Sequence, residues 1–352
     1  MTPLRWGFLS TAGIGRKNWQ ALRRAENCVL TAVAGRDAAR CERYIEEGQA
    51  VAPLGVRPKA IGGYEALIDS PDVDAVYLPL PTALRAEWVI RAARAGKHVL
   101  CEKPCATDAG VLETMLAACR EHRVQFMDGV MFMHHPRLEQ VRAVLDDGVS
   151  TGQIRRIMST FSFQGGGDFF QKNIRVQPEL EPAGCLGDLG WYCLRIALWA
   201  MHWQAPCEVT GRILSSEGRG PAAVPLEFSG ELVFADGVSA GFYCSFTAPH
   251  QQWVNVSGSQ GWLRMDDFVH PANPLAPSFQ LNEVVVPVPT GAADAGRSRA
   301  QDVNMFRNFA DQVRSGRLNP DWPEWSLKTQ LVQDACLRSA RQGGQAVPVT
   351  AF

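Results

Sequence analysis

The sequence predicts an α/β protein in which a doubly wound parallel sheet precedes a second α+β domain with a large, open, mostly antiparallel sheet. Three observations support this prediction. In the first third, short apolar strands alternate with amphipathic helices, as in parallel β-α-β units. A glycine-rich turn follows the first strand, and after about residue 150 one strand follows another directly. Because 352 residues exceed one ordinary core, we expect two domains, 1–126 and 127–352.

The elements of the first domain are read from apolar runs and the helical stretches between them. The expected strands are Arg5–Leu9, Val29–Ala34, Ala75–Leu80, His98–Cys101 and Val124–Met131. The expected helices are Trp19–Arg24, Arg36–Glu47, Leu84–Ala95 and Val111–Glu121. His98–Cys101 is therefore the fourth expected strand.

In the second domain, expected strands follow one another directly, with tight connections between them such as Asp236-Gly237 and Ser259-Gln260-Gly261. The Pro-rich region 271–289 is expected to be a loop around one more strand, Glu283–Val286. The other expected strands are Arg155–Phe163, Val209–Leu214, Gly230–Phe234, Val238–Phe246, Trp253–Gly258 and Trp262–Met265. The expected helices are Leu186–Met201, Gln301–Ser315 and Ser326–Arg341, and the last helix can return to the first domain.

Composition narrows the class of protein. The net charge is −1, with no basic block, which argues against a nucleic acid or membrane-surface partner. No apolar run approaches the roughly 18 residues of a membrane span, and the first residues lack the features of a signal peptide. The ten cysteines are scattered without a Cys-x-x-Cys pair, as in a reducing compartment. We therefore expect a cytoplasmic protein.

The turn after the first strand resembles a dinucleotide-binding turn. Three glycines normally allow a tight turn, close approach of a pyrophosphate and helix–strand packing. Here Ser10, Ala12 and Gly15 stand at those places, so the space is kept and backbone amides can face an anion. The alternative is an ordinary glycine-rich strand–helix turn. The cofactor-binding residues expected in this turn are Ser10, Thr11, Ala12, Gly13, Ile14 and Gly15.

The end of the next strand, Gly35-Arg36-Asp37, lies where the ribose of the cofactor is distinguished. An acidic residue there binds the ribose hydroxyl of NAD, whereas a small residue followed by arginine accommodates the 2′-phosphate of NADP. We favour NADP. Asp37 keeps NAD open, and Arg36 can also be a solvated residue at a helix start.

Two further segments are candidates for chemistry. Lys103 of Glu102-Lys103-Pro104 follows a strand, at the sheet edge where ligands bind, and can position a substrate oxygen or exchange a proton with it. Asp188 and Tyr192 are four residues apart, so they share one face of the expected helix. Glycines near them weaken that helix by about 1 kcal/mol each, which a close ligand would explain. The alternative is a buried helix that Asp188 caps and on which Tyr192 packs.

Together these motifs resemble the Gfo/Idh/MocA oxidoreductase family over nearly the full length, and most resemble its branch with the dimeric dihydrodiol dehydrogenases and their plant relatives. The resemblance implies a Rossmann domain followed by an α/β domain whose open sheet commonly forms the subunit interface. A homodimer or homotetramer is therefore expected. The resemblance is densest at Arg5–Gly15, Gly96–Pro104, Asp128–Arg137 and Asn173–Leu194.

The resemblance also implies roles for individual residues. Lys103 lies at the reacting carbon, Glu102 helps to hold the cofactor, and Asp188 and Tyr192 are the acid and the polar ring residue of the second motif. Arg175 lies beside the substrate or the cofactor. Leu80, Pro81 and Thr82 lie along the nicotinamide ribose. These roles predict hydride transfer between nicotinamide and a hydroxyl or carbonyl carbon, with either Tyr192 or Lys103 carrying the proton.

The implied substrate is a small polyhydroxylated molecule: a sugar, a cyclic polyol or a dihydrodiol. The alternative from another class is a regulator that senses NAD(P) without catalysis. Two positions depart from the family: many relatives have histidine where Arg85 stands and arginine where Met133 stands. The His134-His135 pair has no third ligand at suitable spacing, so we expect it to pack and expect no metal.

Overall fold

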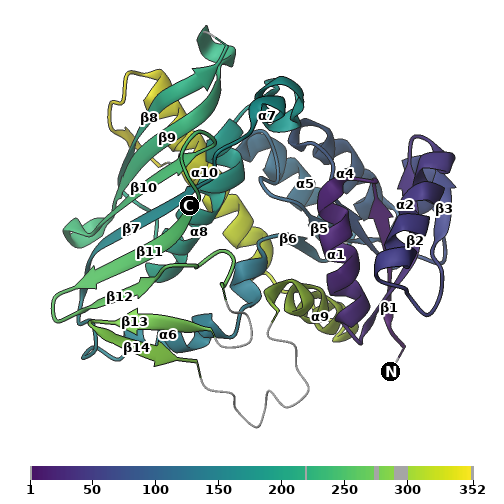
Figure 1. The fold of residues 1–352 in the computed structure, drawn as a ribbon, viewed down its shortest axis with the longest axis horizontal. Helices are drawn as coiled ribbons and strands as arrows, with labels where there is room; N and C mark the ends of the chain where they lie inside the picture. The colour runs from purple at the N-terminus through teal and green to yellow at the C-terminus, as the bar shows by residue number, and fades with distance from the viewer. Residues whose placement is uncertain (1, 219, 273–276, 289–299, 350–352) are drawn as a thin grey trace. The chain divides into compact units, whose positions relative to one another are not determined.

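The computed structural model describes residues 2–218, 220–272, 277–288 and 300–349. These residues form two compact units (Figure 1). The first contains the described residues of 1–106, 110–135 and 298–326, and the second those of 107–109, 136–297 and 327–352. The division into functional domains at residue 126/127 stays a prediction.

The first unit is built on a six-stranded sheet with the order β3-β2-β1-β4-β5-β6, and every neighbouring pair is parallel. This is the strand order of a dinucleotide-binding fold, so the predicted fold class is confirmed. Because β1, β4 and β5 are neighbours, the turns that leave their carboxyl ends lie at one sheet edge. The strands are β1 (Leu4–Leu9), β2 (Cys28–Gly35), β3 (Lys59–Gly62), β4 (Ala75–Leu78), β5 (His98–Cys101) and β6 (Phe126–Asp128).

The predicted helices of this unit are present, and one strand and one helix that were not predicted precede β4. Strand β3 and helix α3 (Tyr64–Ile68) escaped prediction because β3 is short, partly exposed and lies at the sheet edge, where the apolar signal is weak. Strand β5 is consequently the fifth strand along the chain, not the fourth. The other helices are α1 (Gly13–Arg24), α2 (Ala38–Val51), η1 (Thr82–Leu84), α4 (Arg85–Arg94), α5 (Ala109–Glu121), η2 (Met131–His134) and α9 (Gln301–Arg314).

Helix α9 comes from late in the chain but belongs to the first unit, where it lies beside α1 (Figure 1). Its Phe306 ring meets the buried Trp6 of β1 edge-on, with the ring centroids 5.1 Å apart, and Phe309 approaches the same indole at 5.0 Å. Such aromatic contacts bury large apolar areas. The core of the first unit therefore includes a helix that is distant in sequence from the strands it packs on.

The second unit contains a nine-stranded sheet with the order β14-β13-β12-β11-β7-β10-β9-β8-β15 (Figure 1). All neighbouring pairs are antiparallel except β7 and β10, which are parallel. The strands are β7 (Ile154–Ser162), β8 (Glu208–Glu217), β9 (Val224–Val233), β10 (Ser239–Ser245), β11 (Gln251–Gly258), β12 (Trp262–Met265), β13 (Ser278–Leu281), β14 (Val284–Pro287) and β15 (Val347–Pro348).

The tight turns of this sheet agree with the sequence. Asp236 and Gly237 have φ values of 63° and 76°, the conformation that an Asp-Gly hairpin turn requires. Strand β9 starts at Val224, earlier than predicted, and β13 lies where we expected a loop. Residues 273–276 and 289 of the predicted Pro-rich loop lie outside the described residues.

Helices cover one face of this sheet. Helix α8 (Trp191–Ala200) contacts β7 and β10, and it continues from a π-helical segment, η4 (Leu186–Gly190). The predicted helix Leu186–Met201 is thus present but begins as a π-helix. The remaining helices are α6 (Arg137–Asp146), which was not predicted, α7 (Gly167–Lys172), η3 (Ile174–Val176), η5 (Gly220–Ala222), η6 (Ala235–Gly237) and α10 (Asp321–Arg341), within which the two units meet along the chain. In the described part of the chain, no helix combines the length and apolarity that crossing a bilayer needs.

Candidate active site

The turn after β1 has a backbone conformation that explains its small residues. Ser10 has a φ of 151°, which is usual for glycine, and its hydroxyl accepts a hydrogen bond from the Ala12 amide at 3.0 Å. Gly15 lies against the buried Tyr44 ring, and a Cβ on Gly15 would lie 2.6 Å from the Tyr44 Oη. Only glycine therefore allows α1 to pack this closely at the third fingerprint position.

The start of α1 is open to an anion. Ala12 is the N-cap, no described side chain caps this end, and the first turn has no acidic residue. A Cβ on Gly13 would meet no described atom within 4 Å, and Ile14 is 43% exposed. Free amides and the positive end of the helix dipole favour a phosphate here. The residues present fit the pyrophosphate of a dinucleotide.

At the end of β2, Asp37 and Arg36 have different surroundings, which bears on the choice between NAD and NADP. The Asp37 carboxylate caps α2 and accepts a hydrogen bond from the Ala39 amide at 2.9 Å. Arg36 is exposed, and both Arg36 and Arg40 act on Tyr64, whose pKa burial raises while the two guanidinium charges oppose the rise. One carboxylate is thus engaged in capping, beside two cations, which suits the 2′-phosphate of NADP.

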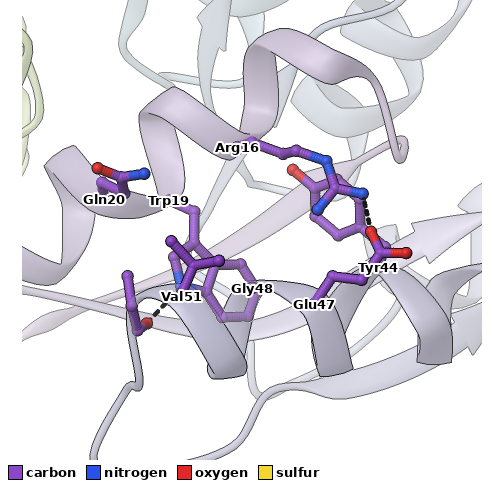
Figure 2. Close-up of a pocket in the computed structure, with 8 residues that line it drawn as sticks. Arg16, Trp19, Gln20, Tyr44, Glu47, Gly48 and Val51 are labelled. Carbon is purple, nitrogen blue, oxygen red and sulfur yellow. Dashed lines mark hydrogen bonds and ion pairs between the residues drawn. The ribbon is translucent and has the colours of Figure 1, made fainter.

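A shallow groove of about 90 Å³ lies between α1 and α2 (Figure 2). It contains none of the predicted site residues and is mainly apolar; its Trp19 donates Nε1–H to the Ala52 carbonyl at 2.8 Å. A Cβ on Gly48 would lie 2.9 Å from this indole, and an Arg16–Glu47 ion pair crosses the groove next to Tyr44. The groove therefore results from close helix packing. Its lining residues are Arg16, Trp19, Gln20, Tyr44, Glu47, Gly48, Val51 and Ala52.

Glu102, Lys103 and Pro104 follow β5 directly and are called the β5 turn below; the Lys103–Pro104 peptide is cis. The Glu102 carboxylate accepts a hydrogen bond from the Tyr77 hydroxyl at 2.6 Å, and that hydroxyl accepts one from the Asn18 amide at 2.5 Å. Burial raises the pKa of Tyr77 far above its ordinary value, and the Glu102 charge raises it further. Tyr77 therefore stays a neutral donor that holds the Glu102 side chain.

The neighbouring turn, after β4, carries the residues predicted to lie along the nicotinamide ribose. Leu80 and Thr82 are almost fully buried, with 4% and 3% exposure, and Pro81 is the N-cap of η1. Arg85, at the start of α4, donates Nε–H to the Leu80 carbonyl at 2.7 Å. The backbone of this turn is thus well fixed, which a binding surface needs.

In the second unit, the π-helical segment η4 places Asp188 beside Arg175. The Arg175 Nε donates to the Asp188 Oδ2 at 2.7 Å, and the Asn173 side chain caps η3 by accepting from the Arg175 amide at 3.1 Å. π-Helical turns are frequent at functional sites. The sequence signalled both charged residues separately but not their pairing, because they are 13 positions apart and no regular repeat relates them.

Tyr192 lies in the first turn of α8 and is 6% exposed. Its ring meets Phe161 of β7 edge-on, with the centroids 5.4 Å apart. Packing of Tyr192 is therefore observed, as one alternative predicted, whereas Asp188 lies within η4 and pairs with Arg175 instead of capping the helix. The predicted site residues fall into two sets, one on each unit, and their convergence on one ligand stays a prediction.

The adjacent histidines have packing contacts. The His134 ring lies edge-on to Trp322 at a centroid distance of 6.1 Å, and its Nδ1 is 3.1 Å from the Asn308 Nδ2. His135 is 4% exposed. Among the residues that the structure describes, no three His, Cys, Asp or Glu side chains are grouped to hold a metal ion.

Comparison with known proteins identifies the family. Residues 4–130 match the model of an oxidoreductase family with an NAD-binding Rossmann fold, and residues 138–264 match the Gfo/Idh/MocA C-terminal domain. The chain belongs to the Gfo/Idh/MocA oxidoreductase family. The family resemblance predicted from the motifs is thus confirmed.

Three relatives show which members of the Gfo/Idh/MocA family are similar. The dTDP-3,4-didehydro-2,6-dideoxy-alpha-D-glucose 3-reductase of Actinomadura kijaniata is 33% identical, over 96% of each chain. The D-xylose 1-dehydrogenase (NADP(+)) 2 of Haloferax volcanii is 30% identical, over 97% of this chain and 98% of its own. The trans-1,2-dihydrobenzene-1,2-diol dehydrogenase of Bos taurus is 30% identical, over 75% of this chain and 74% of its own.

A solved Gfo/Idh/MocA structure extends the likeness to the fold. The crystal structure of KijD10, a 3-ketoreductase from Actinomadura kijaniata in complex with NADP and TDP-benzene, superposes with a TM-score of 0.82 at 29% identity. The match covers 96% of this chain and 98% of that chain. Both sheets of the present chain therefore belong to one shared family architecture.

Proposed function

We propose that this chain is an NADP-dependent oxidoreductase that transfers a hydride between nicotinamide and a carbon bearing a hydroxyl or carbonyl group. The β5 turn is the observation that carries the proposal, because Lys103 follows β5 at the sheet edge where β1, separated from β5 by β4 alone, leads into the open start of α1. The substrate class is a sugar, a cyclic polyol or a dihydrodiol. The names of the 3-ketoreductase, xylose dehydrogenase and dihydrodiol dehydrogenase relatives support this class.

The residues for the cofactor all lie in the first unit. The amides of Thr11 to Ile14 would hold the pyrophosphate, and Arg36 at the end of β2 would pair with the 2′-phosphate. Leu80 to Thr82 would support the nicotinamide ribose, and Glu102 the nicotinamide end. When bound, NADP supplies or accepts the hydride at C4 of its nicotinamide.

The chain's own residues have to bind the substrate oxygen and move one proton. The Lys103 ammonium would hold that oxygen by a charge-assisted hydrogen bond. Either Tyr192 or Lys103 exchanges the proton with it, since a phenol and an ammonium group can both act as general acids. Asp188, paired with Arg175, would orient Lys103 or a second substrate hydroxyl.

The experiment is a substrate panel followed by absorbance of the reduced nicotinamide. Pentoses, hexoses, inositols and trans-dihydrodiols are offered with NADP, and keto sugars, free and nucleotide-linked, with NADPH. We expect turnover with at least one class and a lower dissociation constant for NADP than for NAD. Lys103→Met should reduce kcat by about 100-fold or more while NADPH binding, measured by fluorescence, changes little.

Two results would contradict the proposal. A wild-type kcat in Lys103→Met would show that Lys103 is not needed for the reaction. Tight NADP binding without turnover across the panel would favour the alternative, a regulator that senses the cofactor. Comparing pH–rate profiles of Lys103→Met and Tyr192→Phe separates the two candidate proton carriers.

We also propose a cytoplasmic homodimer or homotetramer that assembles through the open face of the nine-stranded sheet. Phe161 contacts Tyr192 of α8, so the preceding residue, Thr160, points to the opposite face. Tyr243 and Trp253 are in register with Thr160 and share that face, where both are partly exposed. Light scattering on the purified protein tests this assembly, which a monomer over the micromolar range would contradict.

A further inference from the structure

Arg85 is a buried arginine that joins two turns of the first unit. It begins α4, is 4% exposed, and donates Nε–H to the Leu80 carbonyl at 2.7 Å. Its Nη1 donates to the Glu102 carbonyl at 2.8 Å and also to the Pro104 carbonyl. One guanidinium group therefore ties the turn after β4 to the β5 turn.

The position of these acceptors brackets Lys103. The Glu102 carbonyl precedes the lysine and the Pro104 carbonyl follows it, so the backbone on both sides is bound to the same side chain. The Glu102 carboxylate is held separately by Tyr77. Arg85 thus restrains the main chain of the β5 turn, whereas Tyr77 restrains a side chain in it.

Charge considerations argue that these contacts are strong. Among the described residues, no acidic side chain forms an ion pair with Arg85, so the carbonyl dipoles compensate its buried charge. Hydrogen bonds from a guanidinium are stronger than those between neutral groups, and its planar fork fixes their directions. A histidine in this place has only two ring nitrogens and cannot supply these three contacts.

We propose that Arg85 is a positioning residue for the reaction: it sets the place of Lys103 relative to the turn predicted to support the nicotinamide ribose. This inference rests on the proposed function, because it assigns Arg85 to the same site. It predicts that a change at Arg85 lowers kcat through Lys103, with a smaller effect on cofactor binding. Displacing a reacting group by about 1 Å can reduce a rate by roughly 100-fold.

The test compares Arg85→Met and Arg85→Lys with Arg91→Met. Arg91 lies on the same helix, but its guanidinium is exposed and pairs with Glu65 and Glu87, so it is a matched control. We expect kcat to fall by about 100-fold in Arg85→Met and by about 10-fold in Arg85→Lys, with the dissociation constant of NADPH within about threefold of wild type. Arg91→Met should keep the wild-type kcat.

Hydrogen–deuterium exchange of the protein without cofactor gives a second readout that needs no substrate. Amides of residues 102, 103 and 105–107 should exchange about tenfold faster in Arg85→Met, while those of β1 and β2 stay protected. Wild-type kcat together with wild-type exchange in Arg85→Lys or Arg85→Met would overturn the proposal. If Arg85→Met does not fold, Arg85→Lys decides.

The two readouts also separate this inference from the proposed function. A wild-type protein without turnover on the whole panel would contradict the proposed function, while faster exchange in the Arg85 variants would still show that Arg85 holds the β5 turn. If the wild type turns over a substrate and the Arg85 variants have the same kcat and the same amide exchange, only the role of Arg85 is contradicted.

Discussion

The two segments that carry the proposed reactive groups are held by different kinds of interaction. In the first unit, the β5 turn is held by directed hydrogen bonds from Arg85 and Tyr77. In the second unit, the segment from Gly184 to Tyr192 is held mainly by close packing. A Cβ on Gly184 would contact the Pro225 carbonyl, and a Cβ on Gly190 would lie 2.9 Å from Leu186 and 3.2 Å from Cys244.

This difference predicts different sensitivities. A hydrogen-bonded turn loses its position when one donor is removed, because each bond has a direction and a partner that needs it. A packed segment tolerates the loss of a polar contact but not added volume, because the surrounding interior is already dense. Predictions at Gly184 and Tyr77 test the two halves of this comparison, and a third, at Asp334, tests a buried carboxylate elsewhere in the second unit.

The largest effect is expected for Gly184→Ala. Gly184 has a φ of 48°, and an added Cβ would meet the backbone carbonyl of Pro225, which cannot turn away as a side chain can. We expect a loss of about 3–4 kcal/mol in the free energy of unfolding, measured with urea.

Gly166→Ala is the matched control, because Gly166 has a φ of −72° and open space around its Cβ direction. It should change stability by less than about 0.5 kcal/mol. Equal stability losses in the two variants would show that the close packing and positive φ at Gly184 do not require glycine.

The next effect concerns Asp334 of α10, a carboxylate in the second unit. It accepts hydrogen bonds from the Ala109 amide at 2.7 Å and the Gln330 side chain at 2.8 Å, yet burial raises its pKa to about 6. Because an unfolded Asp titrates near 3.9, the folded protein holds this proton more tightly. The stability that the proton provides is present below about pH 4 and is lost as the pH rises through about 6.

Asp334→Asn keeps one acceptor oxygen and removes the titration. Between pH 4 and pH 7, the variant should gain about 2 kcal/mol relative to wild type in the free energy of unfolding. Urea titrations at several pH values measure this difference, in which the other titrating groups cancel. Parallel curves for the two proteins would show that the carboxylate is not destabilised by burial.

The smallest effect is expected for Tyr77→Phe, which removes the donor to Glu102. It should lower the free energy of unfolding by about 1–2 kcal/mol, since the carboxylate oxygen and the Asn18 amide both lose a partner. Tyr44→Phe is the control: the Tyr44 hydroxyl is buried without a hydrogen-bond partner among the residues that the structure describes. Its removal should leave the free energy of unfolding unchanged or raise it. Equal stability losses in Tyr77→Phe and Tyr44→Phe would show that the hydrogen bond to Glu102 does not hold the β5 turn.

Much of the fold followed from local pattern. The strands β1, β2, β4 and β5 and the hairpin at Asp236-Gly237 were predicted because apolar runs and turn residues act within a few positions. Strand β3 was missed because an exposed edge strand needs few apolar residues. Helix α9 was predicted as a helix, but its place in the first unit depends on contacts such as that of Phe306 with Trp6, 300 positions earlier in the sequence.

The candidate site divides in the same way. By itself, the sequence determined the fold class, the family and the residues with reactive groups, because turn chemistry and short motifs are local properties. Only the tertiary structure decided that Tyr77 donates to Glu102 and that Arg85 binds the carbonyls on either side of Lys103. These contacts join residues 17 to 25 positions apart, across neighbouring parallel strands. Strand order and register bring such residues together, and neither is set by the residues beside them in sequence.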